Sequence, residues 1–152
     1  MDATDTSTEA RARREDRGPE YHPDCFACAP RHPFGLKVAF AKVGDCRVEG
    51  TFPCGWFFQG YPGKLHGGIV STLLDSAMVH ALMNEGIEAV TADLQIRFKK
   101  PVEVGVPARI LGERRGQRGP IHDMVAVLEQ KGQVKATARA RFLEIRQAPS
   151  VR

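Results

Sequence analysis

Hydrophobic and polar positions along the chain predict one long helix with strands before and after it. From 69 to 84 the chain has neither glycine nor proline, and its apolar residues recur at helical spacing. Gly67 and Gly68 allow a sharp turn before this segment, while Asn84 and Gly86 are stop signals after it. The apolar stripe consists of Ile69, Val70, Leu73, Leu74, Ala77 and Ala81.

Strand patterns occur both before and after this helix in the sequence. Segments 36–43 and 46–52 read as two strands joined by a turn at Gly44-Asp45, and Pro53 ends the second because proline cannot donate to a strand ladder. After the helix, glycine and proline separate four further segments with strand character. These are 88–99, 104–114, 121–130 and 133–145.

Two of these four segments have one apolar and one polar face. In 88–99 and 133–145 apolar and polar residues alternate, which is typical of an antiparallel sheet with one face in water. The fold class predicted from these patterns is α+β, with an antiparallel sheet packed on one helix. The two apolar faces are Val90, Ala92, Leu94, Ile96 and Phe98, and Val134, Ala136, Ala138, Ala140 and Phe142.

The composition fits one small globular domain between polar ends. The chain has 152 residues, with 42% hydrophobic and 26% charged residues, which suffices for a sizeable core. We predict a disordered tail at 1–20, a domain at 21–146 and a C-terminal tail at 147–152. No apolar run approaches the roughly 20 residues needed to span a bilayer, and the first residues lack a secretory signal pattern. We therefore expect a cytoplasmic protein that does not enter a membrane.

The charge distribution favours a phosphorylated small molecule over nucleic acid as a ligand. The formal net charge is +4, although residues 1–20 hold more acidic than basic residues, so the body of the chain is basic. A basic surface suits either class of ligand. Aromatic residues make up only 7%, the basic residues are dispersed, and no known nucleic-acid-binding motif is present. We expect no nucleic-acid partner.

A group of histidines and cysteines near the start raises the question of a metal. His22, Cys25, Cys28 and His32 are all zinc-ligand types, but they lie within eleven residues and no second pair follows at the usual distance. We favour a structural lead-in segment, with zinc binding and redox chemistry as the alternatives. We expect no catalytic metal and no cofactor.

The run LHGGIVSTLLDSA at 65–77 carries the clearest chemistry. A histidine and two glycines precede a helix, so backbone N–H donors and the positive end of the helix dipole stand near one carboxylate, Asp75. Asp75 lies away from the apolar stripe, and a solvated aspartate is therefore the alternative interpretation. Val79 and Leu82 project near it, which makes that face less polar than a solvated one.

This run resembles the acyl-CoA thioesterases of the hotdog fold, in particular the PaaI-like branch of the phenylacetic acid pathway. The resemblance extends to VTADLQIRFKKPV at 90–102 and Gly105, and upstream to CFAC at 25–28 and PFGL at 33–36. It implies a curved antiparallel sheet wrapped around one long central helix. It also implies a homodimer, or a dimer of dimers, that pairs through strand 88–99 and has its active sites at the interface.

By this resemblance, the chain hydrolyses the thioester of an acyl-CoA or acyl-carrier-protein substrate to free acid and thiol. Asp75 would be the nucleophile or general base, and the Gly67 N–H would donate to the thioester oxygen. His66 would position the carbonyl or the loop, and Gln59 matches a polar residue before the turn. Val79 departs from the pattern, because many relatives have serine or threonine there.

Substrate contacts are expected from the glycine turn, an aromatic loop and a basic rim. The aromatic residues have an alternative role in capping the core, and the basic residues an alternative as solvated charges. Two other functions remain open, a hydratase or dehydratase acting on acyl-CoA and a non-catalytic acyl-CoA-binding protein. The expected contact residues are Gly68, Trp56, Phe58, Tyr61, Arg97, Lys99 and Lys100.

Overall fold

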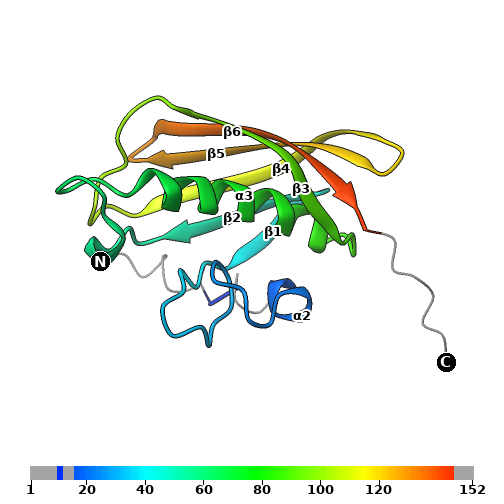
Figure 1. Ribbon diagram of the computed structural model, residues 1–152, viewed down its shortest axis with the longest axis horizontal. Helices are drawn as coiled ribbons and strands as arrows, with labels where there is room; N and C mark the ends of the chain where they lie inside the picture. Colours follow the sequence, from blue (N-terminus) through cyan, green and yellow to red (C-terminus); the bar gives the residue numbers. More distant parts are fainter. Residues whose placement is uncertain (1–9, 12–15, 146–152) are drawn as a thin grey trace.

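A computed structural model describes residues 10–11 and 16–145 of the chain. Six antiparallel strands form one sheet in the order β1-β2-β4-β5-β6-β3, and the long helix α3 lies across one face of it (Figure 1). This arrangement confirms the predicted α+β hotdog fold. The strands are β1 (Phe40–Gly44), β2 (Arg47–Phe52), β3 (Ala89–Phe98), β4 (Ala108–Arg118), β5 (Ile121–Gln130) and β6 (Gln133–Glu144). The helices are α2 (Gly18–Tyr21), the short 3-10 helix η1 (Trp56–Phe58) and α3 (Gly67–Met83).

The core lies between α3 and the sheet. Ten of the 17 residues of α3 are buried, since all six strands of the sheet contact the helix. The helix begins two residues before the predicted start and ends before Asn84, as the stop signals predicted. No helix in the described part of the chain is long and apolar enough to cross a membrane.

The sheet comes close to the helix backbone at Gly112 in β4. A β-carbon at this position would lie 2.5 Å from the carbonyl carbon and oxygen of Ala77, so only glycine fits without displacing the helix backbone. The alanines of β6 are buried as predicted, with Ala136 and Ala138 almost fully inaccessible. The close contact at Gly112 nevertheless lies on β4, two strands away from the alanine-rich β6.

The predicted alternation of β3 is interrupted by a bulge between Thr91 and Asp93. Thr91 lies opposite Phe142, a buried core residue, so its side chain faces the helix. Beyond the bulge Leu94 lies opposite Ala140, which faces the helix as well. Val90 precedes the bulge and belongs to the opposite face, which corrects the single apolar face predicted for 88–99. A bulge adds one residue and thereby reverses which residues point inward.

The predicted disordered tail at 1–20 is ordered in part. The Asp16 side chain is buried, accepts hydrogen bonds from the Phe40 N–H (3.1 Å) and the Gly18 N–H (2.7 Å), and lies 3.3 Å from Nε2 of His80. The Asp16 carboxylate anchors residues 16–20, which have little apolar surface. The composition of this segment could not reveal the anchor. Residues 1–9, 12–15 and 146–152, and with them the predicted C-terminal tail at 147–152, lie outside the described residues.

Replacing Gly112 with alanine should destabilise the fold. The added methyl must push α3 away from β4, and such overpacking typically costs about 1–3 kcal/mol. We expect the melting temperature of Gly112→Ala to fall by several degrees in a thermal scan, at about 2–4 °C per kcal/mol for a domain of this size. Gly116→Ala in the same strand is the control, because its added β-carbon would be 3.7 Å from the nearest atom. Equal melting temperatures for the two variants would contradict the tight contact.

Candidate active site

His66 caps the N-terminus of α3 and leaves one backbone donor open. Its backbone is extended (φ −60°, ψ 134°), and its Nδ1 accepts a hydrogen bond from the Gly68 N–H at 2.8 Å. The His66 carbonyl accepts from the N–H groups of Ile69 and Val70. Within the described residues, the Gly67 N–H has no acceptor. The end of the helix dipole therefore presents a single unpaired N–H, at Gly67.

The two glycines allow neighbouring side chains to come close to the backbone, and they do not form the sharp turn that the sequence suggested. Neither Gly67 nor Gly68 has a positive φ. A β-carbon on Gly68 would lie 3.1 Å from Nδ1 of His66, so glycine leaves room for the capping ring. The nearest side chain to a β-carbon on Gly67 would be Phe98, at 3.7 Å. The glycines thus keep His66 close and Gly67 accessible.

A cavity of about 250 Å³ lies beside the open Gly67 N–H. Leu65, Val70, Phe98 and Val102 supply most of its apolar wall, and Lys64, Lys99 and Lys100 stand around it. A ligand held here would place polar atoms at the helix N-terminus and apolar atoms against the wall, which is the usual character of a small-molecule site.

Gln130 supports one wall of this cavity and was not anticipated from the sequence. It is buried at the end of β5, and its Oε1 accepts from the Glu103 N–H at 2.9 Å. Its Nε2 donates to the carbonyls of Glu103 (2.9 Å) and Val106 (2.8 Å). These three bonds fix the loop that carries Val102, whose carbonyl accepts from the Leu65 N–H. Only the three-dimensional neighbourhood identifies this glutamine, because its partners lie more than twenty residues away.

Asp75 lies on α3, partly buried, with a hydroxyl against it. Oγ1 of Thr91, from β3, donates to Oδ1 of Asp75 at 2.7 Å. Burial raises the pKa of the Asp75 carboxyl above its ordinary value, while the Thr91 hydrogen bond and the nearby His22 act in the opposite direction. Val79 offers no hydroxyl one turn along the helix, and Thr91 supplies one from the neighbouring strand instead. The β3 bulge is what turns Thr91 toward Asp75.

Gly67 and Asp75 are too far apart to act on one carbonyl within a single chain. They are eight residues apart on one helix, which separates them by about 12 Å along its axis. An oxyanion donor and a general base must each come within about 3 Å of the reacting atoms. The short sequence spacing therefore does not place both groups at one centre in the same protomer.

Gln59 lies next to the helix N-terminus but bonds within its own loop. Its Oε1 accepts from the Gly63 N–H at 3.2 Å, and its backbone pairs with Leu65 in an isolated bridge. The carbonyl of the preceding residue accepts from the His66 N–H at 2.9 Å. In this chain Gln59 thus shapes the loop that leads into the site.

The predicted aromatic contacts separate into two groups. Phe58 packs against the Phe52 ring at a centroid distance of 5.7 Å and joins the core, as the alternative interpretation suggested. Trp56 and Tyr61 are 70% and 85% exposed, and neither lines the 250 Å³ cavity. Within one chain, these two rings are placed to meet solvent or another molecule.

The predicted basic contacts are distributed over two concave surfaces. Lys99 and Lys100 lie at the cavity beside Gly67. Arg97, with Lys99, lines a wider open groove of about 1200 Å³ along β3, β5 and β6. These three side chains form no salt bridge with a described carboxylate, unlike Arg115, which pairs with Glu113. Their charge is therefore available to an anionic ligand.

Comparisons with known proteins find similarity to thioesterases over part of the chain. The family described as Thioesterase superfamily matches residues 62–113, which contain α3 and β3. Acyl-coenzyme A thioesterase THEM4 of Mus musculus is 39% identical over 69 residues, covering 45% of this chain and 29% of that protein. The chain thus matches less than a third of the length of this curated relative.

Solved structures agree on the fold. The PaaI protein of E. coli, from the phenylacetic acid degradation operon, superposes with a TM-score of 0.75 at 17% identity, covering 92% of this chain and 97% of that one. A hypothetical thioesterase of Streptococcus pneumoniae, solved with coenzyme A, superposes with a TM-score of 0.68 at 22% identity, covering 72% and 87%. These superpositions show that the chain has the hotdog fold, and the segment matched by the Thioesterase superfamily model lies within that fold.

Removing the hydroxyl beside Asp75 should raise the pKa of that carboxyl further. Thr91→Val keeps the side-chain shape but deletes the hydrogen bond that favours the ionised form, so ionisation of Asp75 should require higher pH. Carbon-13 NMR of the Asp75 carboxyl during a pH titration measures this directly. Thr137→Val on β6 is the matched control and should leave the titration unchanged. An unchanged Asp75 titration in Thr91→Val would show that the hydrogen bond does not favour the carboxylate.

Proposed function

We propose that the protein hydrolyses the thioester of an acyl-CoA or a related pantetheine-linked substrate. The observation that carries this proposal is the open Gly67 N–H, which stands at a helix N-terminus beside an apolar cavity. An N–H in this position stabilises the negative charge that develops on a thioester oxygen under attack. The relatives named acyl-coenzyme A thioesterase support the same substrate class.

The surroundings of Gly67 suit the two ends of such a substrate. The wall formed by Leu65, Val70 and Phe98 offers apolar contact for an acyl or pantetheine chain. Lys99 and Lys100 at the cavity can attract the phosphates of coenzyme A. The Streptococcus pneumoniae relative solved with coenzyme A is consistent with this assignment.

We propose Asp75 as the group that attacks the thioester, directly or through a water molecule. Both routes need the ionised carboxylate, and Thr91 favours that form by donating to it. The Streptococcus pneumoniae protein has also been solved as two alanine variants, at an aspartate and at a threonine sixteen residues further along. Asp75 and Thr91 have the same spacing, which supports their pairing as a functional unit.

The distance between Gly67 and Asp75 supports a catalytic homodimer. Since about 12 Å separates them along α3, a complete site requires the Asp75 of one protomer near the Gly67 of another. β3 offers the surface, because it is a sheet edge, paired only with β6 among the described strands. It also exposes Val90 (48%) and Phe98 (56%), and an open edge with exposed apolar residues invites a second copy of the same strand.

Asp75→Asn tests the carboxylate. The amide keeps the shape but cannot act as base or nucleophile, so turnover should fall by roughly a hundredfold or more. Substrate binding should change little, since the Gly67 donor remains. Thiol release from a panel of acyl-CoAs, followed with a thiol reagent, measures the rate. Wild-type turnover in this variant would refute the assignment of Asp75, and acyl-CoA hydration or binding without thiol release by the wild type would refute hydrolysis.

Gly67→Pro tests the donor within the same assay. Proline fits the first position of a helix and prefers an extended residue before it, as His66 is (ψ 134°). The variant should therefore fold, lack only the N–H, and lose about 10²–10³ in turnover. Gly67→Ala is the matched control, because it keeps the N–H and its β-carbon makes only ordinary contact with Phe98. Equal turnover in the proline and alanine variants would exclude Gly67 as the oxyanion donor.

A further inference from the structure

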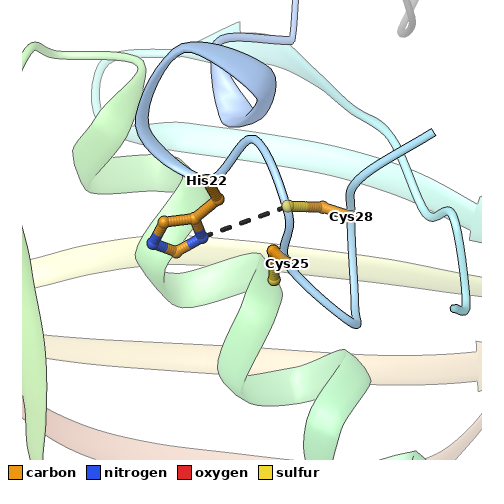
Figure 2. Close-up of side chains that lie close together, drawn as sticks. All are labelled: His22, Cys25 and Cys28. Carbon is orange, nitrogen blue, oxygen red and sulfur yellow. Dashed lines mark hydrogen bonds between the residues drawn. The ribbon is translucent and has the colours of Figure 1, made fainter. Parts of the chain in front are cut away.

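Three side chains able to bind a metal meet in the segment between α2 and β1. Nδ1 of His22 lies 4.0 Å from Sγ of Cys28, and the ligand atoms of His22, Cys25 and Cys28 all lie within 4.8 Å of one another. Figure 2 shows the imidazole ring directed toward the two sulfur atoms, on a loop beside α3. Both cysteines are free thiols.

These distances are close to those of a tetrahedral zinc site. Zinc bonds of about 2.3 Å to sulfur and about 2.0–2.1 Å to nitrogen put neighbouring ligand atoms about 3.6–3.8 Å apart. The observed separations exceed this by at most about 1 Å, a gap that small side-chain rotations close. We propose that His22, Cys25 and Cys28 bind a zinc ion.

The local backbone supports a thiolate at Cys25. The Ala27 N–H donates to Sγ of Cys25 at 3.3 Å, and the Cys25 carbonyl accepts from the Ala29 N–H at 2.9 Å. An N–H directed at sulfur stabilises the negative charge of a metal-bound thiolate and fixes its orientation. The loop therefore already supplies the second layer of contacts that a cysteine ligand needs.

The chemistry of the three ligands selects zinc. Thiolate and imidazole together favour zinc over calcium or magnesium, which prefer oxygen ligands. Two thiolates also neutralise the dication, so a partly buried site carries little net charge.

The fourth coordination position falls to water, because the neighbouring His80 faces a different partner. The His80 ring meets His22 edge-on, with centroids 6.5 Å apart. His80 is 1% exposed, its Nδ1 bonds the Ser76 carbonyl, and its Nε2 makes no hydrogen bond in the described part of the chain, although Asp16 lies 3.3 Å away. The Asp16 carboxylate thus already faces this nitrogen, and His80 is not among the residues whose ligand atoms lie within 4.8 Å of one another.

This proposal departs from the interpretation that the sequence favoured. Four ligands within eleven residues lacked a second pair, and on that ground zinc was the weaker alternative. The structure nevertheless brings the side chains of His22, Cys25 and Cys28 together, while His32 lies outside the group. A metal here would cross-link a segment with almost no regular secondary structure.

Metal analysis of the untagged, full-length protein tests the site. After incubation with zinc under reducing conditions and removal of free ion, we expect about one zinc per chain in the wild type. Cys25→Ser and Cys28→Ser should each retain less than about a tenth of that amount. His32→Gln is the matched control from the same segment and should keep the metal. Absence of zinc from the wild type, or equal content in all four proteins, would overturn the proposal.

If the cysteine variants do not fold, a cobalt spectrum of the wild type tests whether the cysteines bind the metal. Cobalt added to the metal-free wild type should give thiolate-to-metal absorption bands together with the visible bands of a tetrahedral site. Chelation should also lower the melting temperature of the wild type, and zinc should restore it. A cobalt spectrum without thiolate bands would refute the site. Because none of these readouts uses turnover, they do not depend on the proposed hydrolysis.

Discussion

The burial of α3 against the sheet is the contact on which the rest of the molecule depends. Gly112 lets β4 approach the helix backbone at Ala77, and the sheet then encloses the helix along its length. A rigid helix fixes both functional positions at once. Its N-terminus presents Gly67 to the cavity, and its side presents Asp75 to the edge strand, where Thr91 holds the carboxylate. Neither position can move without disturbing the core.

Under the proposed function, the same rigidity requires a second chain. Two groups about 12 Å apart on one helix cannot be brought together by a change within the protomer. In the proposed dimer β3 provides the interface, because its Thr91 contacts Asp75 and it is an exposed, partly apolar edge strand. The β3 bulge turns Thr91 inward, toward Asp75, and leaves Val90 on the outer face, where it can contact a second chain. The strand that would pair with a second chain is thus also the strand that holds the Asp75 carboxylate.

Periodicity predicted most of the fold because burial has a regular spacing in helices and strands. It predicted α3 and all six strands to within a few residues, the largest offsets being at the start of the first strand and at both ends of the fourth. It could not predict the bulge at Thr91, the burial of Asp16 or the loop support from Gln130, because each depends on a partner distant in sequence. The HGG run and Asp75 could be recognised in the sequence. Their separation of about 12 Å follows from their positions on α3, eight residues apart.

The central claim is that each site takes Gly67 from one protomer and Asp75 from the other, and mixed dimers test it most directly. Gly67→Pro and Asp75→Asn subunits, each inactive alone, are co-expressed and purified together. In a mixed dimer one site would contain both wild-type groups, so random pairing should restore about a quarter of wild-type turnover. No recovery in verified mixed dimers, or a fully active monomer, would contradict the account.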